Sequence, residues 1–224
     1  MCFCAAASFS AGAVLTLIGV VTIKLRKRRE EVFFAMIPLL FGMQQFIEGL
    51  LWLSFQFDGE TLNVVMTYVF VLFSHVMWPV FVPFSIGFME TVPWRKKVIR
   101  GFQLTGIAVA VYLLYFIVRY PITSEIRGHI VYVFPHFHIP PVLVLYIAAT
   151  CVSALFSSQR IVNLFGALAF VLFVVAFWFY YAAFFSVWCF FAAILSVMIF
   201  LHFRFRSFKG LSFELFIHSC RKYL

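Results

Sequence analysis

Charge is the scarcest property of this sequence. Of its 224 residues only 11% are charged, whereas 65% are hydrophobic and the mean hydropathy is +1.06. Soluble domains carry about 25% charged and about 45–50% apolar residues. The composition therefore excludes a soluble globular enzyme, a disordered chain and a collagen-like chain. It predicts an all-α integral membrane protein with several transmembrane helices.

The sequence also lacks the patterns of several well-known classes. Its five cysteines are odd in number and without paired spacing, which argues against a disulfide framework. No Gly-rich phosphate loop and no Gly-x-Ser-x-Gly elbow occurs. The last apolar segment lacks the lysine of a retinal protein. Only His75 lies clearly inside an apolar segment, whereas ceramidase-type zinc hydrolases need several such histidines. These absences exclude the classes concerned, and we predict no metal site.

Seven apolar segments are predicted to cross the membrane in a single domain over residues 1–203. A spanning helix needs about 20 apolar residues. The segments are Ala5–Ile23, Val32–Phe55, Val64–Phe88, Phe102–Tyr120, Pro141–Phe156, Ile161–Tyr181 and Ser186–Phe203. The last two are separated by an uncharged stretch, so six spans with one re-entrant element remain an alternative. Residues 204–224 are predicted to form a basic amphipathic helix on the membrane surface.

The basic residues predict the orientation of these seven segments. All of the 17 Lys and Arg residues except Arg119 and Arg127 fall on one predicted side. They occupy residues 24–29, 95–100, 160 and 204–222. The positive-inside rule places this side in the cytoplasm, so the amino terminus is outside and the carboxyl terminus cytoplasmic. The net charge of +9 is then a topology signal, and the lipid bilayer, not nucleic acid, is the predicted partner.

The second apolar segment contains the residue that is most costly to bury. Gln44, Glu48 and Trp52 are four apart and share a helix face, and Gln45 lies beside Glu48. Glu48 lies roughly 12 Å from the outer end of the segment, at 1.5 Å per residue. A carboxylate at that depth costs several kcal/mol unless it is neutral or paired. We interpret it as a proton- or ligand-binding acid; the alternative is a protonated glutamate that joins helices by hydrogen bonds.

The third apolar segment supplies the predicted partner of Glu48. His75 lies at compatible depth, one turn before Trp78. Pro79 removes the amide that would bond the His75 carbonyl, and Pro83 does the same to the carbonyl of Pro79. Such interrupted helices line binding sites in transporters. The alternative is a kinked helix with one hydrogen-bonded histidine.

Residues 120–141 form the longest predicted loop, on the outer side. The loop contains Arg127, His129, His136 and His138, and we predict an ordered cap over the bundle. His136 and His138 would share a face in an extended segment, but two histidines without a nearby carboxylate or cysteine make a weak metal site.

Two further features involve cysteine. Removal of Met1 would leave Cys2 with a free amine and a thiol, a candidate nucleophile, although a loose terminus is the simpler interpretation. In the last segment small residues recur at spacings of three and four, at Ser186, Cys189, Ala192, Ala193 and Ser196. That stripe predicts close packing of helices.

Several of these motifs together resemble a known family. They are Met1–Phe3, Ala7–Phe9, Ala11–Gly12, Ile37–Gly42, Gln44–Gln45, Glu48–Gly49, Trp78–Pro79, Gly128–Ile130 with Tyr132, and Ser186–Phe190. The chain resembles an uncharacterised family of small bacterial multi-pass membrane proteins that begin Met-Cys-Phe-Ser, and it departs from them at Cys4. The resemblance implies a bacterial cytoplasmic membrane and places Cys2, Glu48, Trp78 and Trp188 in recurring motifs. It implies no activity.

Three functions are compatible with these residues. The first is a small transporter or intramembrane ligand-binding protein, with a small molecule or ion held by Gln44, Gln45, Glu48, His75 and Trp78. The second is a membrane-embedded enzyme acting on a lipid or quinone, with Glu48 and His75 as acid–base pair and Cys2 as a possible nucleophile. The third is a structural subunit of a membrane complex. No residue pattern indicates the substrate, a cofactor or the oligomeric state.

Overall fold

The computed structural model confirms the all-α fold class. It describes residues 4–134 and 139–221, and for residues 182 and 207–221 only the course of the backbone. Within this part of the chain six helices are long and apolar enough to cross a membrane, and the apolar helix Pro140–Leu155 is shorter. The six are Ala5–Leu25, Arg29–Gln56, Glu60–Met89, Pro93–Arg119, Arg160–Phe179 and Phe184–Arg206.

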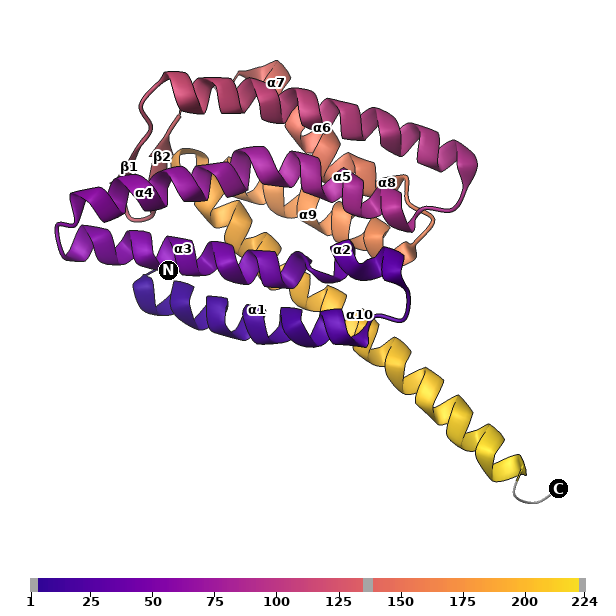
Figure 1. The fold of residues 1–224 in the computed structure, drawn as a ribbon. Coiled ribbons are helices and arrows are strands. Elements are labelled where there is room, and N and C mark those ends of the chain that lie inside the picture. Colours follow the sequence, from indigo (N-terminus) through magenta and orange to yellow (C-terminus); the bar gives the residue numbers. More distant parts are fainter. Residues whose placement is uncertain (1–3, 135–138, 222–224) are drawn as a thin grey trace.

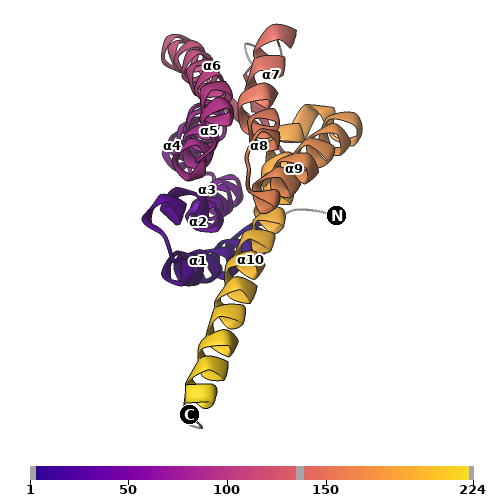
Figure 2. The same cartoon turned by 90° about the vertical axis from the view of Figure 1, so that its right-hand side faces the viewer.

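Three of these helical rods change helical type along their length, so that each contains several successive elements; they are Arg29–Gln56, Glu60–Met89 and Pro140–Leu155. In chain order the elements are α1 (Ala5–Leu25), η1 (Arg29–Glu31), α2 (Val32–Ala35), α3 (Ile37–Gln56), α4 (Glu60–Val71), η2 (Leu72–Met77), α5 (Trp78–Met89), α6 (Pro93–Arg119), β1 (Thr123–Ile126), β2 (Ile130–Val133), α7 (Pro140–Ile147), η4 (Ala148–Val152), α8 (Ser153–Leu155), α9 (Arg160–Phe179), η5 (Tyr181–Ala183) and α10 (Phe184–Arg221). The elements η2 and η4 are π-helical, and η1 and η5 are 3₁₀-helical. Successive rods run in alternating directions, and α10 crosses the bundle obliquely (Figures 1 and 2).

Small residues bring α1 and α3 into close contact. A Cβ atom on Gly19 would lie 2.4 Å from the backbone nitrogen of Leu39, and one on Gly12 would lie 3.2 Å from the carbonyl oxygen of Gly42. Close backbone approach of this kind is how helices associate where lipid surrounds them. These glycines therefore hold α3, the helix that carries Glu48, against α1.

The segment predicted as an outer cap contains the only strands in the described residues. Strands β1 and β2 pair antiparallel, with Ser124 opposite Tyr132, and the turn between them passes through Gly128 at φ 78°. Ser124 shares a hydrogen bond of 2.7 Å with Thr67 of α4. The residues of β2 from Ile130 to Tyr132 are buried. The hairpin is therefore fixed to α4 and covers one end of the bundle, which we call the hairpin end.

The opposite end, which we call the basic end, gathers the turn after α1 and the α5–α6 and α8–α9 connections (Figure 1). Arg206 of α10 reaches the same end, where it bonds Glu31. Basic residues predicted to share one membrane side thus lie at one end of the bundle. The assignment of that end to the cytoplasm stays a prediction. Two buried carboxylates organise this end, and each has a full set of donors.

The first of these carboxylates is Glu90, in the α5–α6 connection. It accepts backbone hydrogen bonds from Thr91, Val92 and, at 2.6 Å, from Ser158 in the α8–α9 connection. Arg95 donates to the carbonyl of Ser157 at 2.6 Å. Burial acts to raise the pKa of Glu90, but these hydrogen bonds outweigh it and hold the pKa below its ordinary value. Glu90 and Arg95 therefore clamp two connections together.

The second carboxylate is Glu31, which follows the turn after α1. It accepts two backbone hydrogen bonds of 3.2 Å, from Lys27 and Arg28. Both of its oxygens are also bonded by the guanidinium of Arg206 on α10, at 2.6 and 2.7 Å. A bidentate pair of this type fixes orientation as well as charge. Glu31 therefore ties the start of α2 to α10.

Candidate functional site

One face of α3 carries three adjacent polar side chains into the middle of the bundle. Gln44 and Gln45 are fully buried and Glu48 is 2% exposed. The Glu48 carboxylate accepts a hydrogen bond from Ser186 of α10, 138 positions along the chain, and one of 3.4 Å from Gln45. Ser186 was predicted as part of a packing stripe and belongs to one of the motifs of the family resemblance; its hydroxyl is in addition bonded to the buried acid.

Gln44 connects this face of α3 to α5. Its side-chain oxygen accepts a hydrogen bond of 2.8 Å from the indole nitrogen of Trp78. Phe41, one turn earlier on α3, stacks on Trp78 with ring centroids 4.2 Å apart. The two helices thus hold the predicted residues Gln44 and Trp78 in one rigid contact.

His75 reaches the same region from η2. One of its ring nitrogens, Nδ1, shares a hydrogen bond of 2.7 Å with the hydroxyl of Ser74. The ring packs on Phe185 at 4.1 Å between centroids and on Phe134 at 5.4 Å. Phe185 packs on His75, and the next residue, Ser186, donates to Glu48. His75 and Glu48 therefore contact neighbouring residues of α10. The hydrogen bonds described for the Glu48 carboxylate come from α3 and α10, so the predicted acid–base pair of Glu48 and His75 stays a prediction.

The chain around Pro79 differs from the prediction because η2 is a π-helix. The amide of Trp78 bonds the carbonyl of Phe73, five residues earlier instead of four. In this register the carbonyl opposite the missing amide of Pro79 is that of Ser74, not that of His75. The hydroxyl of Tyr146 from α7 donates to this Ser74 carbonyl. The interruption in the helix is therefore closed by a side chain from a neighbouring helix.

The carbonyl of Pro79, predicted to be left open by Pro83, is also covered. A Cβ atom on Gly106 of α6 would lie only 1.9 Å from this oxygen, so the glycine permits α6 to pack directly on it. That oxygen therefore faces α6.

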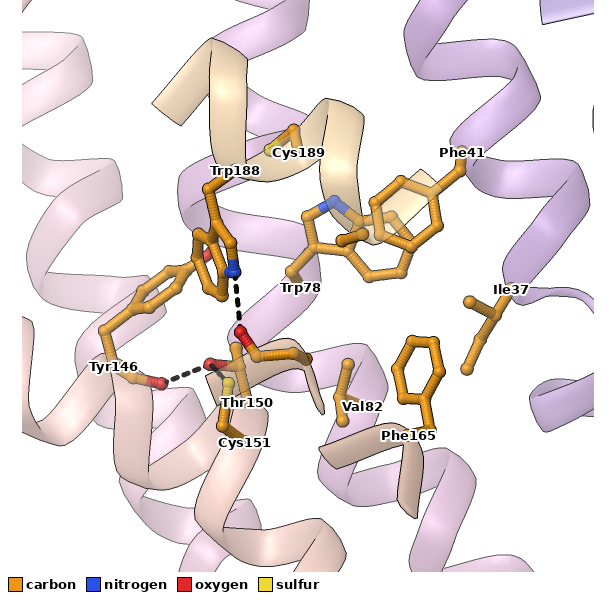
Figure 3. A pocket seen from close by; sticks show the side chains of 12 residues that line it. Ile37, Phe41, Trp78, Val82, Tyr146, Thr150, Cys151, Phe165, Trp188 and Cys189 are labelled. Atoms are coloured by element: carbon orange, nitrogen blue, oxygen red, sulfur yellow. Dashed lines mark hydrogen bonds between the residues drawn. The ribbon is translucent and has the colours of Figure 1, made fainter. Parts of the chain in front are cut away.

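A narrow cavity lies beside the Glu48 group, between α3, α5, η4, α9 and α10. Its volume is about 40 Å³ and its lining is almost entirely apolar. In Figure 3 the stacked rings of Phe41 and Trp78 lie on one side, and Trp188 and Tyr146 lie near Thr150 and Cys151. Trp188 donates a hydrogen bond of 3.1 Å to the carbonyl of Ala169. The π-helical segment η4 lines this cavity with Thr150 and Cys151, and η2 ends at Met77, next to the lining residue Trp78; π-helical segments occur frequently at functional sites.

Among the side chains that sequence reasoning did not assign to the site, three have polar groups directed toward its surroundings. Tyr146 bonds the interrupted helix, Trp188 lines the cavity, and Tyr132 of β2 is close enough for the charge of Glu48 to act on it. The family resemblance included Trp188 and Tyr132, which is the only signal in the sequence that singled them out. Tyr146 lies in an apolar run without any distinguishing pattern.

The two predicted cap residues that the structure describes, Arg127 and His129, do not join this site. Arg127 is exposed and pairs with Glu125 at 2.7 Å, and the ring of His129 packs against Tyr180 with centroids 5.4 Å apart. The other predicted residues of this group, His136 and His138, lie outside the described residues, as does Cys2. Within the described ranges no group of three His, Cys, Asp or Glu side chains is arranged to hold a metal ion.

Comparison with known proteins gives one match. The model of a family of unknown function, DUF6629, matches residues 1–212. No curated protein and no solved structure matches the chain.

Proposed function

The chain belongs to the DUF6629 family of unknown function, and we propose that it is a small transporter or ligand-binding protein whose interior site is built on Glu48. In this proposal Glu48 is the group that takes up a proton. Gln44, Gln45, Trp78 and His75 surround it. The site lies inside an integral membrane protein of the bacterial cytoplasmic membrane, with the basic end in the cytoplasm.

The observation that carries the proposal is the poor compensation of Glu48. Its described hydrogen bonds come from one hydroxyl and one amide, and the side-chain oxygen of Gln45 has no partner among the described residues. A fixed negative charge with so few donors is costly inside a membrane. Glu48 is therefore suited to exist as a neutral acid that releases and regains its proton.

The neighbouring cavity supports a site that opens and closes. A volume of about 40 Å³ accommodates water or a small ion, whereas pockets for larger organic ligands measure about 300–1,000 Å³. Binding a larger molecule therefore requires the surrounding helices to separate. The π-helical segments η2 and η4 are where the helical register already changes, so they are the natural places for that movement.

The test is proton movement in proteoliposomes that contain a pH-sensitive dye. After an external pH step, with the membrane potential clamped, wild-type protein should equilibrate the interior faster than protein-free liposomes. Glu48→Gln should return the rate to that of the protein-free liposomes. The matched control is Glu60→Gln, a change at an exposed carboxylate on α4, which should behave as wild type.

Infrared difference spectra separate binding from transport. The carbonyl stretch of a protonated carboxyl should respond to pH in the wild type and be lost in Glu48→Gln. A wild-type signal without accelerated proton movement would retain the binding protein and reject the transporter. Equal spectra and equal rates in wild type and Glu48→Gln would contradict the proposed function.

A further inference from the structure

The hairpin directs one polar side chain into the bundle. Tyr132 lies opposite Ser124 in the β1–β2 register, and Ser124 is bonded to Thr67 of α4. The Tyr132 ring stacks on Phe70, one turn further along α4, with centroids 4.4 Å apart and planes within 4°. Both contacts fix the ring on the bundle side of the hairpin.

The hydroxyl of Tyr132 is buried without a hydrogen-bond partner among the described residues. Burial, with smaller contributions from the charges of Glu48 and Cys189, raises the pKa of Tyr132 well above its ordinary value. The hydroxyl therefore stays neutral and lies within electrostatic reach of the Glu48 carboxylate. A buried hydroxyl without a hydrogen-bond partner lowers the stability of the fold, so stability does not explain why a tyrosine occupies this position.

Two more polar atoms without partners lie along α3 in the same region. The indole nitrogen of Trp52 is one helical turn from Glu48, toward the hairpin end, and the side-chain oxygen of Gln45 lies on the other side of Glu48. Trp52 also lines a hollow of about 370 Å³ at the hairpin end, together with Cys4, Gln56 and Gly128 and three further residues. Polar atoms thus extend from this hollow to the buried acid.

We propose that the hollow at the hairpin end, Trp52 and Tyr132 form the route by which protons reach Glu48. This inference rests on the proposed function, because it assumes that Glu48 takes up a proton. It adds that protons reach Glu48 from the hairpin end, and that Trp52 and Tyr132 affect proton transfer without themselves being the proton-binding group. A polar separation longer than a hydrogen bond is commonly bridged by water, and the unpartnered atoms would bind such waters.

The transfer is a relay without net change in Tyr132. A water in the route takes up a proton from the aqueous solution in the hollow and passes one of its own protons to the Tyr132 oxygen, while the Tyr132 hydroxyl proton passes to a bridging water, which passes one of its protons to the Glu48 carboxylate. Bonds to hydrogen form and break in equal number, the entering proton ends on Glu48, and no tyrosinate is formed. The other titratable groups of this region include Cys4 at the hollow, Cys189 of α10, and His75 beyond Phe185.

Tyr132→Phe tests the relay because it removes only the hydroxyl. In the proteoliposome assay we expect proton movement to slow by at least about tenfold, the order of effect of one positioned proton-transfer group. Thermal stability should be unchanged or higher, because the lost hydroxyl has no partner. The matched control is Tyr115→Phe, at an exposed tyrosine of α6, which should leave both quantities unchanged.

A second variant, Trp52→Phe, tests the route even if Tyr132→Phe fails to fold. It should slow proton movement by a smaller factor, about threefold, since a donor that only binds water contributes less than the relay itself. Trp94→Phe, at a half-exposed tryptophan of the basic end, is its control. Wild-type rates in both Tyr132→Phe and Trp52→Phe, together with loss in Glu48→Gln, would overturn the route while keeping the site. Wild-type rates in Glu48→Gln would instead reject the proposed function.

Discussion

Buried glutamates in the middle of the bundle and at its basic end differ in the number and kind of their hydrogen-bond partners. Glu31 and Glu90 at the basic end are 7% and 2% exposed, and Glu48 in the middle is 2% exposed. Glu31 is paired with a guanidinium and two amides, and Glu90 with three amides. Glu48 has one hydroxyl and one side-chain amide. All three side chains have little exposed surface, but Glu48 lies deep within the bundle whereas Glu31 and Glu90 lie near its end, and their hydrogen-bond partners differ as well.

Under the proposed function, this difference distinguishes two structural carboxylates from the carboxyl group that is proposed to exchange a proton. A carboxylate that accepts several charge-assisted hydrogen bonds is stabilised as an anion and fixes the segments that donate them. A carboxyl with few donors, inside an apolar bundle, is free to change its protonation state. The comparison predicts that losses of stability concentrate at the basic end and at tight helix contacts, whereas losses of function concentrate at Glu48.

The largest effect on stability is expected at the closest helix contact of the middle region. Gly106→Ala would place a Cβ atom 1.9 Å from the carbonyl oxygen of Pro79, so α5 and α6 must separate. We expect a loss of about 3 kcal/mol or more, at the upper end of overpacking effects. The measurement is equilibrium unfolding with SDS in mixed micelles. Gly101→Ala on the same helix, with no atom within 4 Å, is the control and should be neutral or slightly stabilising.

The next effect is expected at Glu90. Glu90→Ala leaves three backbone amides without their acceptor, and we expect a loss of about 3 kcal/mol from several charge-assisted hydrogen bonds. Glu30→Gln, at an exposed carboxylate of the same end, should change the free energy of unfolding by less than about 0.5 kcal/mol. A neutral result for Glu90→Ala would remove the basis of the comparison.

The stabilising effect of Glu90 should depend on pH. Because the pKa of Glu90 in the folded protein is below its ordinary value of 4.5, the stabilisation is present above that value. It is lost as the pH falls through the folded pKa. The difference in unfolding free energy between wild type and Glu90→Gln should therefore be constant near neutral pH and shrink in acid. A difference that grows in acid would contradict the assignment.

A smaller effect is expected at the Glu31–Arg206 pair. The side chain of Arg206 is 33% exposed, so solvent screens part of the interaction. Glu31→Gln should cost about 1–2 kcal/mol, and a double-mutant cycle with Arg206→Gln should give a coupling energy of about 1 kcal/mol. Additive single effects would show that the backbone donors of Glu31, and not Arg206, carry its role.

The smallest effect on stability is expected at Glu48. Glu48→Gln keeps the shape and an acceptor for Ser186, so the free energy of unfolding should change by less than about 1 kcal/mol. Proton movement should nevertheless be lost, as described above. A loss of stability as large as that of Glu90→Ala would show that Glu48 is a structural carboxylate too, and would end the distinction between the two regions.

Much of the fold follows from local sequence patterns. Apolar runs long enough to span a membrane predict helices, and the scarcity of charge excludes a soluble fold. The hairpin was not predicted, because its two strands are only four residues each and lie in a loop that has no clear alternation. The π-helical register before Pro79 was not predicted either. The donor that bonds the free carbonyl of Ser74 is the hydroxyl of Tyr146, which belongs to a helix distant in the sequence.

Only the part of the candidate site that lies on one helix was predicted from the sequence. The polar face of Gln44, Gln45 and Glu48 is visible in the sequence because helical spacing relates neighbours on one helix. The hydroxyl of Ser186 bonds Glu48 from 138 positions away, and Tyr132, 84 positions away, is close enough for the charge of Glu48 to act on it. No spacing rule connects such distant residues. Ser186 was grouped with small residues of its own helix, where local reasoning places it.

The sequence by itself determined the all-α class, the grouping of basic residues and the presence of one costly acid inside an apolar helix. These properties depend on composition and on residues within a few turns of one another. Only the tertiary structure decided which carboxylates are compensated, because hydrogen-bond partners come from whichever helices pack together. It is the packing of α3 against α10 and the hairpin that leaves Glu48 with few donors and sets Tyr132 near it.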